Sequence, residues 1–164
     1  MKVFGFAGWS GAGKTTLIEQ LIPRLVKRGL KVSLIKHAHH SFDVDQPGKD
    51  SHRHREAGCR EVMIVSDRRW VIMHELRGEP EPTLEEQIGR VSPCDLLFVE
   101  GYKSHPIPKL EIWRKANGKP FLHPEDRHIV AIAADAAVDT ALPRFGLDDY
   151  DGINDFILGF SGTR

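Results

Sequence analysis

The chain has 164 residues, with 23 lysines and arginines against 23 acidic residues, so its formal net charge is zero. This balance disfavours capture of nucleic acid or of an anionic membrane by bulk charge, two cysteines are too few for a disulfide scaffold, and no apolar run approaches the ~20 residues of a membrane span. The composition, 40% hydrophobic and 28% charged, is that of an ordinary globular protein, which we expect in a reducing cytoplasm.

The opening of the chain predicts a parallel strand–helix–strand unit. A short apolar run at residues 3–7 ends in a glycine-rich turn and is typical of a buried strand. Apolar residues then recur on one helical face over 17–26, and the helix is expected to end near Gly29. Residues 31–37 favour a second strand, and the polar, turn-rich segment 38–48 is expected to be an exposed loop.

The middle of the chain predicts a short helix, a hairpin and another core strand. Residues 49–57 favour the helix, and two strand-like runs at 61–66 and 70–76 are separated by a short turn. Thr83, with a glutamate three residues later, forms a capping box for a further helix. The apolar run 95–99 (DLLFV) is typical of a core strand.

The last third predicts a second ribbon and a last core strand. Residues 108–114 alternate in polarity and are followed by a turn at 116–119, which is typical of a β-ribbon. Residues 129–134 (IVAIAA) form an apolar run expected to be the last core strand. Asp151 is placed to cap a terminal helix.

Residues 8–15 (GWSGAGKT) carry the Walker A pattern G-x-x-x-x-G-K-[ST] between a predicted strand and a predicted helix. The glycines let backbone N–H groups converge on one anion, and the following helix adds its positive N-terminus. In such loops the lysine meets the β- and γ-phosphates, and the hydroxyl after it joins a Mg²⁺ shell. A flexible turn without a ligand is the alternative, which the agreement of strand, loop and helix disfavours. The expected nucleotide contacts are Gly8, Ser10, Gly11, Ala12, Gly13, Lys14, Thr15 and Thr16.

The predicted fold class is therefore α/β, a P-loop NTPase-like, mainly parallel sheet with flanking helices. We expect one nucleotide-binding domain over residues 1–164, with smaller β-ribbon elaborations at 60–80 and 105–120.

A Mg²⁺ ion needs a further oxygen ligand, usually a carboxylate at the carboxyl end of a neighbouring core strand. Asp95 stands at the start of the strand 95–99, at the wrong end, whereas Glu100 stands at its exit. We expect Glu100 to share the metal with Thr15 and, together with Lys14, to be the candidate catalytic group. A structural strand-end acid is the alternative.

The acidic loop after the second strand is also expected to overhang the phosphate site. It contains Asp43, Asp45 and Asp50, of which Asp45 is a third candidate metal ligand. A nucleotide-dependent switch and plain solvated charge are equally compatible with this loop. Nearby histidines lack the spaced Cys or carboxylate partners of a zinc site; they are His37, His39 and His40.

The sequence contains no clear motif for recognition of the base, because the Asn-Lys-x-Asp signature of many GTPases is absent. Asp135 follows the strand 129–134, where its carboxylate is placed to accept hydrogen bonds from the N1 and N2 groups of guanine. A turn cap is an equally good interpretation of Asp135. Arg68 and Arg69 lie in the predicted hairpin turn, where solvation or a phosphate or partner contact is expected.

The residues described so far resemble one family, the molybdopterin-guanine dinucleotide biosynthesis protein B (MobB) family. The phosphate loop alone occurs in many protein families. The combination of two further motifs is specific to this family: KHAHH…DxDxPGKDS and, later in the chain, VEGYK. The resemblance spans nearly the whole chain. It rests on 8–16 (GWSGAGKTT), 34–51 (LIKHAHHSFDVDQPGKDS), 57–58 (AG), 95–103 (DLLFVEGYK) and 126–135 (DRHIVAIAAD).

The resemblance implies a GTP-binding P-loop protein with Mg²⁺, acting in molybdenum cofactor biosynthesis as an adaptor with weak GTPase activity at most. It also implies a homodimer joined by β-ribbons and a partner guanylyltransferase, MobA, that attaches GMP to molybdopterin; direct contact with molybdopterin is left open. Two alternatives remain: a small-molecule kinase whose loop 43–50 holds an acceptor hydroxyl, and a scaffold whose nucleotide is structural.

Overall fold

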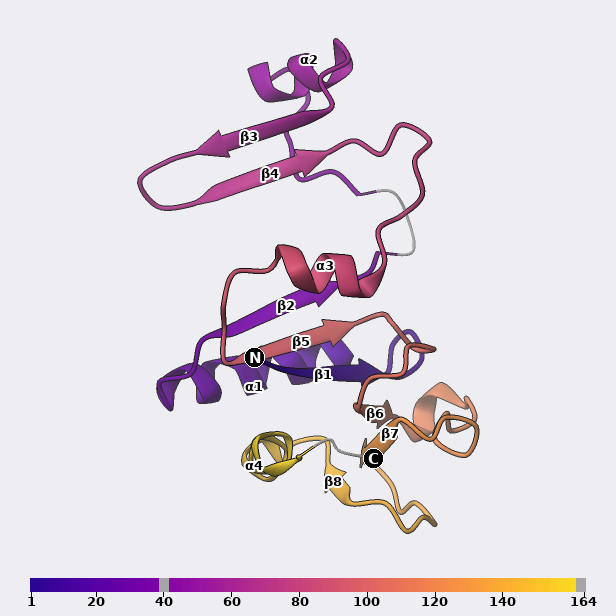
Figure 1. Ribbon diagram of the computed structural model, residues 1–164. Coiled ribbons are helices and arrows are strands. Elements are labelled where there is room, and N and C mark those ends of the chain that lie inside the picture. The colour runs from indigo at the N-terminus through magenta and orange to yellow at the C-terminus, as the bar shows by residue number, and fades with distance from the viewer. Residues whose placement is uncertain (39–41, 162–164) are drawn as a thin grey trace. The chain divides into compact units, whose positions relative to one another are not determined.

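The structure is a computed structural model that describes residues 1–38 and 42–161. It divides into two compact units, which we name the core unit, Met1–His37 with Val91–Arg164, and the hairpin unit, Ala38–Arg90 (Figure 1). The single domain predicted over residues 1–164 stays a prediction, because two compact units can belong to one folding domain.

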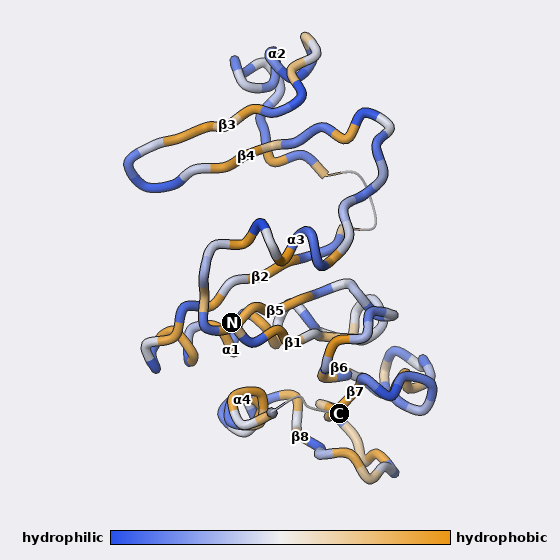
Figure 2. The backbone as a smooth tube through the Cα atoms, in the orientation of Figure 1, coloured by the Kyte–Doolittle hydropathy of each residue, from blue (hydrophilic) through white to orange (hydrophobic). Residues whose placement is uncertain are grey.

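The core unit is built on a six-stranded sheet in the order β2-β5-β1-β6-β7-β8, in which every neighbouring pair is parallel. Because β1 and β5 are central and buried, their residues are almost all apolar (Figure 2). The α/β prediction is confirmed. The strands are β1 (Lys2–Ala7), β2 (Val32–Lys36), β5 (Leu96–Glu100), β6 (Lys109–Trp113), β7 (Ile129–Ala134) and β8 (Arg144–Gly146).

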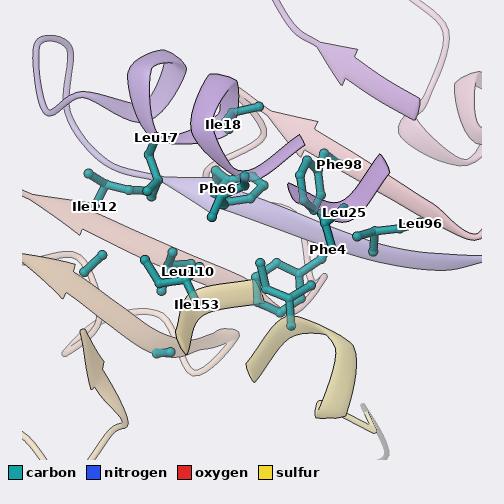
Figure 3. Packing of buried hydrophobic residues seen from close by; sticks show 14 of the residues in the cluster. Phe4, Phe6, Leu17, Ile18, Leu25, Leu96, Phe98, Leu110, Ile112 and Ile153 are labelled. Carbon is teal, nitrogen blue, oxygen red and sulfur yellow. The ribbon is translucent and has the colours of Figure 1, made fainter. Parts of the chain in front are cut away.

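Helices α1 (Lys14–Lys27) and α4 (Tyr150–Gly159) cover one face of this sheet. Their apolar stripes, which include Leu17 and Ile153, meet inward-facing side chains of the strands such as Phe4 (Figure 3). The buried stripe of α1 is shorter than predicted, because Val26, at its C-terminal end, is exposed. α1 begins directly after the glycine-rich loop, so this packing fixes the loop against the sheet.

The ribbon predicted at residues 105–120 is wrong. Residues 109–113 are a central strand, β6, which pairs in parallel with both β1 and β7. The prediction failed because Lys109 and Glu111 alternate with Leu110 and Ile112, the pattern of a half-exposed strand. Both charged side chains are in fact buried, with 1% and 0% exposure.

Two details near the C-terminal end also differ from the prediction. Strand β8 follows β7, so residues 129–134 are not the last core strand. The cap of α4 is Asp149, whose carboxylate accepts a hydrogen bond from the Gly152 N–H, and not Asp151, which lies in the first turn. Both aspartates suit a helix N-terminus, and only the observed start of the helix separates them.

The hairpin unit contains the antiparallel pair β3 (Glu61–Val65) and β4 (Trp70–His74), which confirms the ribbon predicted within 60–80. Helix α2 (Asp50–Glu56) precedes it and α3 (Leu84–Arg90) follows it. The predicted capping box of α3 is present: the Thr83 N–H donates to Glu86 Oε2 (2.8 Å), and the Glu86 N–H donates to Thr83 Oγ1 (3.2 Å).

Across both units, no helix in the described part of the chain is long and apolar enough to cross a membrane.

Candidate functional site

The phosphate loop connects the end of β1 to the start of α1. Gly8 touches the neighbouring strand so closely that a Cβ would lie 2.4 Å from the carbonyl oxygen of Ile112. Gly13, the residue before α1, has a φ of 96° in the left-handed region. The glycines at both ends of the pattern are therefore required by the backbone path, independently of any ligand.

Lys14 folds back over this loop. Its Nζ donates hydrogen bonds to the carbonyl oxygens of Gly8 (2.9 Å) and Trp9 (3.0 Å). Burial lowers the pKa of Lys14 below its ordinary value; the Glu100 carboxylate opposes this shift, and Lys103 and Lys36 add to it. A phosphate group, with stronger acceptor oxygens than a carbonyl, suits this partly desolvated ammonium.

Thr15 and Glu100 meet as the sequence predicted. The Thr15 hydroxyl donates to Glu100 Oε1 (3.2 Å), and Glu100, at the carboxyl end of β5, is a buried residue with only 6% exposure. Lys36 Nζ, at the end of β2, lies 3.6 Å from Glu100 Oε2. Asp95 lies at the other end of β5, where its Oδ2 accepts from the Lys31 N–H (2.7 Å).

This pair of oxygen groups fits Mg²⁺, which takes one or two protein ligands and completes its shell with substrate phosphates and water. Residues 1–38 and 42–161 contain no group of three or more His, Cys, Asp or Glu side chains able to hold a metal by themselves. The Thr15 hydroxyl and the Glu100 carboxylate therefore suit a metal that arrives with a nucleotide.

Two side chains that the sequence analysis missed support the loop from the segment after β6. Arg114 Nε donates to the Ala12 carbonyl (3.1 Å), and Asn117 Nδ2 donates to the Ser10 carbonyl (3.2 Å). They were missed because this segment was assigned to a ribbon. Had β6 been predicted next to β1, the loop after it would have been expected at the same edge of the sheet.

Asp135 belongs to the same edge. It directly follows β7, and its Oδ1 accepts a hydrogen bond from the Lys115 N–H (2.8 Å). The structure thus shows Asp135 bracing the segment after β6, and its contact with a base stays a prediction.

Trp9, the second residue of the loop pattern, joins the loops that follow β5 and β6. Its Nε1 donates to the Pro120 carbonyl (2.8 Å). Lys103 Nζ lies 4.5 Å from the centre of the Trp9 ring system and Lys119 Nζ lies 5.9 Å from it. These are cation–π distances, so two ammonium groups gather on one indole beside the phosphate loop.

The buried charges of β6 anchor these two loops. Lys109 Nζ donates to the carbonyls of Lys103 and His105 (both 2.7 Å) and pairs with Asp126 (2.6 Å). Glu111 accepts from the N–H groups of Leu122 (2.6 Å) and His123 (2.9 Å). A buried charge is tolerated only when it is paired in this way.

The acidic loop lies in the hairpin unit, where Arg55 organises it. Its guanidinium donates hydrogen bonds to the carboxylates of Asp43, Asp45 and Glu75. Asp45 also accepts a hydrogen bond from the Ser51 hydroxyl (2.8 Å). The hydrogen bond from Arg55 lowers the pKa of Asp43. Burial raises the pKa of Asp45, but its hydrogen bonds outweigh that effect and the pKa is lowered.

Both oxygens of Asp45 are thus engaged within the hairpin unit, and its role as a metal ligand stays a prediction. Asp50 lies 3.9 Å from Arg53 on the exposed start of α2. Of the loop histidines, His39 and His40 lie outside the described residues. The arginines of the hairpin turn, Arg68 and Arg69, are exposed as expected.

A parallel sheet with a Walker A loop between β1 and α1 defines an α/β protein of the P-loop NTPase type. The family model described as "Molybdopterin guanine dinucleotide synthesis protein B", MobB, matches residues 3–135. The chain belongs to the MobB family, which confirms the resemblance drawn from its sequence.

Individual relatives cover the chain almost completely. A "Molybdopterin-guanine dinucleotide biosynthesis adapter protein" of Escherichia coli (strain K12) is 40% identical over 159 residues, 95% of this chain and 91% of that protein. A protein of the same name from Haemophilus influenzae is 41% identical over 171 residues, covering 99% and 93%. A crystal structure of a molybdopterin-guanine biosynthesis protein B matches with a TM-score of 0.75 at 26% identity, covering 95% of this chain and 97% of the other.

Proposed function

We propose that this protein is a GTP-binding adaptor in the biosynthesis of molybdopterin guanine dinucleotide, with weak Mg²⁺-dependent GTPase activity at most. The observation that carries the proposal is the meeting of Thr15 and Glu100 beside Lys14 at the phosphate loop. The names of the relatives supply the process and the adaptor role.

The phosphates of GTP are assigned to the loop and to Lys14, whose contacts with the Gly8 and Trp9 carbonyls they would replace. The Thr15 hydroxyl and the Glu100 carboxylate are the proposed ligands of Mg²⁺, which neutralises charge on the β- and γ-phosphates when bound. Guanine is assigned to Asp135, which uses one carboxylate oxygen for the Lys115 N–H and keeps a second.

Slow turnover is consistent with the surroundings of Glu100. Its two oxygens face the Thr15 hydroxyl and the Lys36 ammonium, so the carboxylate is held in a positioning role. A general base needs a free oxygen within hydrogen-bond reach of the attacking water. Glu100 in this position is therefore suited to hold the metal on which hydrolysis depends, and it is not suited to act as a general base, so we expect hydrolysis to be slow.

The partners follow from the hairpin unit and from the adaptor role. We propose that the β3–β4 hairpin joins two copies of the chain, because an isolated two-stranded hairpin is marginal in water and this one exposes an apolar strip. The guanylyltransferase MobA is the proposed second partner, with the cytoplasm as the compartment; direct contact with molybdopterin stays open. The exposed residues of the strip are Met63, Ile64, Val65, Trp70, Val71 and Ile72.

Isothermal titration of the purified protein with GTP and with ATP, each with Mg²⁺, tests the nucleotide assignment. We expect GTP to bind and ATP to bind at least about tenfold more weakly. A carboxylate that faces the base accepts hydrogen bonds from the N1 and N2 groups of guanine, and adenine does not offer the same donors. Tight binding of ATP without GTP would refute the proposal. Phosphate transfer to a defined acceptor would instead favour the small-molecule kinase.

A further inference from the structure

Positive charge collects at the phosphate loop of this electrically neutral chain. Lys14, Lys36 and Lys103 are close enough for the latter two to lower the pKa of Lys14, and Lys119 shares the Trp9 indole with Lys103. Lys36 has Glu100 as its partner. Within residues 1–38 and 42–161, Lys103 and Lys119 form no salt bridge and have only the indole face.

The backbone at Lys103 is anchored, although its ammonium forms no salt bridge with any residue that the structure describes. Buried Lys109 donates to the Lys103 carbonyl (2.7 Å), which holds the backbone of the loop after β5. Lys109 can cross beneath the loop because Gly5 has no side chain: a Cβ there would lie 2.6 Å from Lys109 Cγ. The backbone that carries Lys103 is thus anchored, and its ammonium lies 4.5 Å from the centre of the Trp9 ring.

The direction of this loop indicates what Lys103 would meet. Lys103 follows Glu100 by three residues at the carboxyl end of β5, next to the strand that leads into the phosphate loop. Metal carboxylates in this position serve the β- and γ-phosphates. Lys103 is also close enough to Lys14, which is assigned to the β- and γ-phosphates, to act on its charge, so we expect its ammonium within reach of the terminal phosphate.

We propose that Lys103, held on the indole of Trp9, contacts the terminal phosphate of the bound nucleotide and makes the site prefer a triphosphate over a diphosphate. The inference rests on the proposed function, because it needs a nucleotide on the loop. An indole is a weaker partner for an ammonium than a phosphate oxygen. The γ-phosphate supplies the anion that this arrangement lacks.

Calorimetric titration of GTP and GDP, with Mg²⁺, onto four proteins tests the proposal: wild type, Lys103→Met, Lys103→Arg and the control Lys27→Met. Lys27 is exposed at the end of α1 and carries the same charge. We expect Lys103→Met to lower the affinity for GTP about tenfold and the affinity for GDP less than about twofold, because one charge-assisted hydrogen bond to the terminal phosphate is lost. Lys103→Arg should retain most of the preference, and Lys27→Met all of it.

Equal weakening of GTP and GDP by Lys103→Met, or no weakening of either, overturns the inference while leaving the proposed function intact. A wild-type protein that binds neither nucleotide overturns the proposed function and the inference together. A second readout uses the emission of Trp9 in a Trp70→Phe, Trp113→Phe background, which leaves one of the three tryptophans. GTP should change this emission more than GDP, and Lys103→Met should abolish the difference.

Discussion

Thr15 and Glu100 are 85 residues apart in the sequence, yet the Thr15 hydroxyl donates a hydrogen bond to the Glu100 carboxylate at 3.2 Å. The contact exists because β1 and β5 are parallel neighbours, so the loop after β1 and the acid at the end of β5 come to the same edge of the sheet. A hydroxyl and a carboxylate placed in this way suit a Mg²⁺ ion carried by a nucleotide.

Glu100→Gln tests this relationship. We expect the substitution to lower the rate of Mg²⁺-dependent GTP hydrolysis about tenfold or more. The affinity for GTP should fall less than about threefold, because the loop keeps its phosphate contacts. Phosphate release in single-turnover reactions gives the first quantity and calorimetry the second. Glu19→Gln, on the exposed face of α1, is the control; hydrolysis unchanged in Glu100→Gln removes Glu100 from the chemistry.

Gly5→Ala tests the close packing of Lys109 against β1. The new methyl group would stand 2.6 Å from Lys109 Cγ and 3.0 Å from Ile107 Cδ1, and Lys109 is too buried to move aside. We expect the free energy of unfolding in urea to fall by about 1–3 kcal/mol. Gly159→Ala, where no atom beyond the chain neighbours and the backbone of its own helix lies within 4 Å of the added carbon, should show no such loss; equal effects would argue against the steric explanation.

The pair of Lys109 and Asp126 predicts a pH dependence. Burial raises the pKa of Asp126, but hydrogen bonds from Lys109 and from the His128 N–H outweigh this, so its pKa is lowered. A lowered carboxyl pKa gives stability that is present above the unfolded value and lost as the pH falls through the folded one. The wild type should therefore lose this stability below about pH 4.

Lys109→Met removes the cause of that shift. We expect about 3 kcal/mol lower stability at neutral pH, because Asp126 loses its buried partner, and a smaller further loss on acidification than in the wild type. Denaturant midpoints measured between neutral pH and pH 3 give both quantities. A variant with the same acid sensitivity as the wild type would show that Lys109 does not control Asp126.

The hairpin strip predicts the oligomeric state. Met63 and Ile72 are cross-strand partners and both are exposed. Replacing both with aspartate should give a monomer by sedimentation with unchanged GTP affinity, because the phosphate loop lies in the core unit. Arg69→Asp, in the hairpin turn, should leave the dimer intact; a double variant that stays dimeric would exclude the strip as the interface.

The sequence predicted those parts of the structure that have a fixed local pattern. The Walker A spacing, followed by the apolar stripe of α1, located the loop, and the exit of the run DLLFV located Glu100. The capping box of Thr83 and Glu86 was also visible, because it depends on residues only three apart.

The parts that failed depend on contacts between distant residues. Strand β6 was mistaken for a ribbon because its charged residues, Lys109 and Glu111, are buried. Their hydrogen-bond partners include backbone groups of loops, which a local sequence pattern cannot predict. The contacts of Arg114 and Asn117 with the phosphate loop were missed with it. Strand β8, with three residues, is too short to give a periodic signal.

The most direct test of a nucleotide-dependent adaptor is guanylyl transfer to molybdopterin by the partner guanylyltransferase, measured with and without this protein in the presence of GTP and Mg²⁺. We predict that the wild-type protein raises the rate of transfer and that Lys14→Ala, which loses the ammonium over the phosphate loop, does not. Equal stimulation by Lys14→Ala, with nucleotide binding lost and the dimer intact, would contradict the proposal and leave a scaffold in its place.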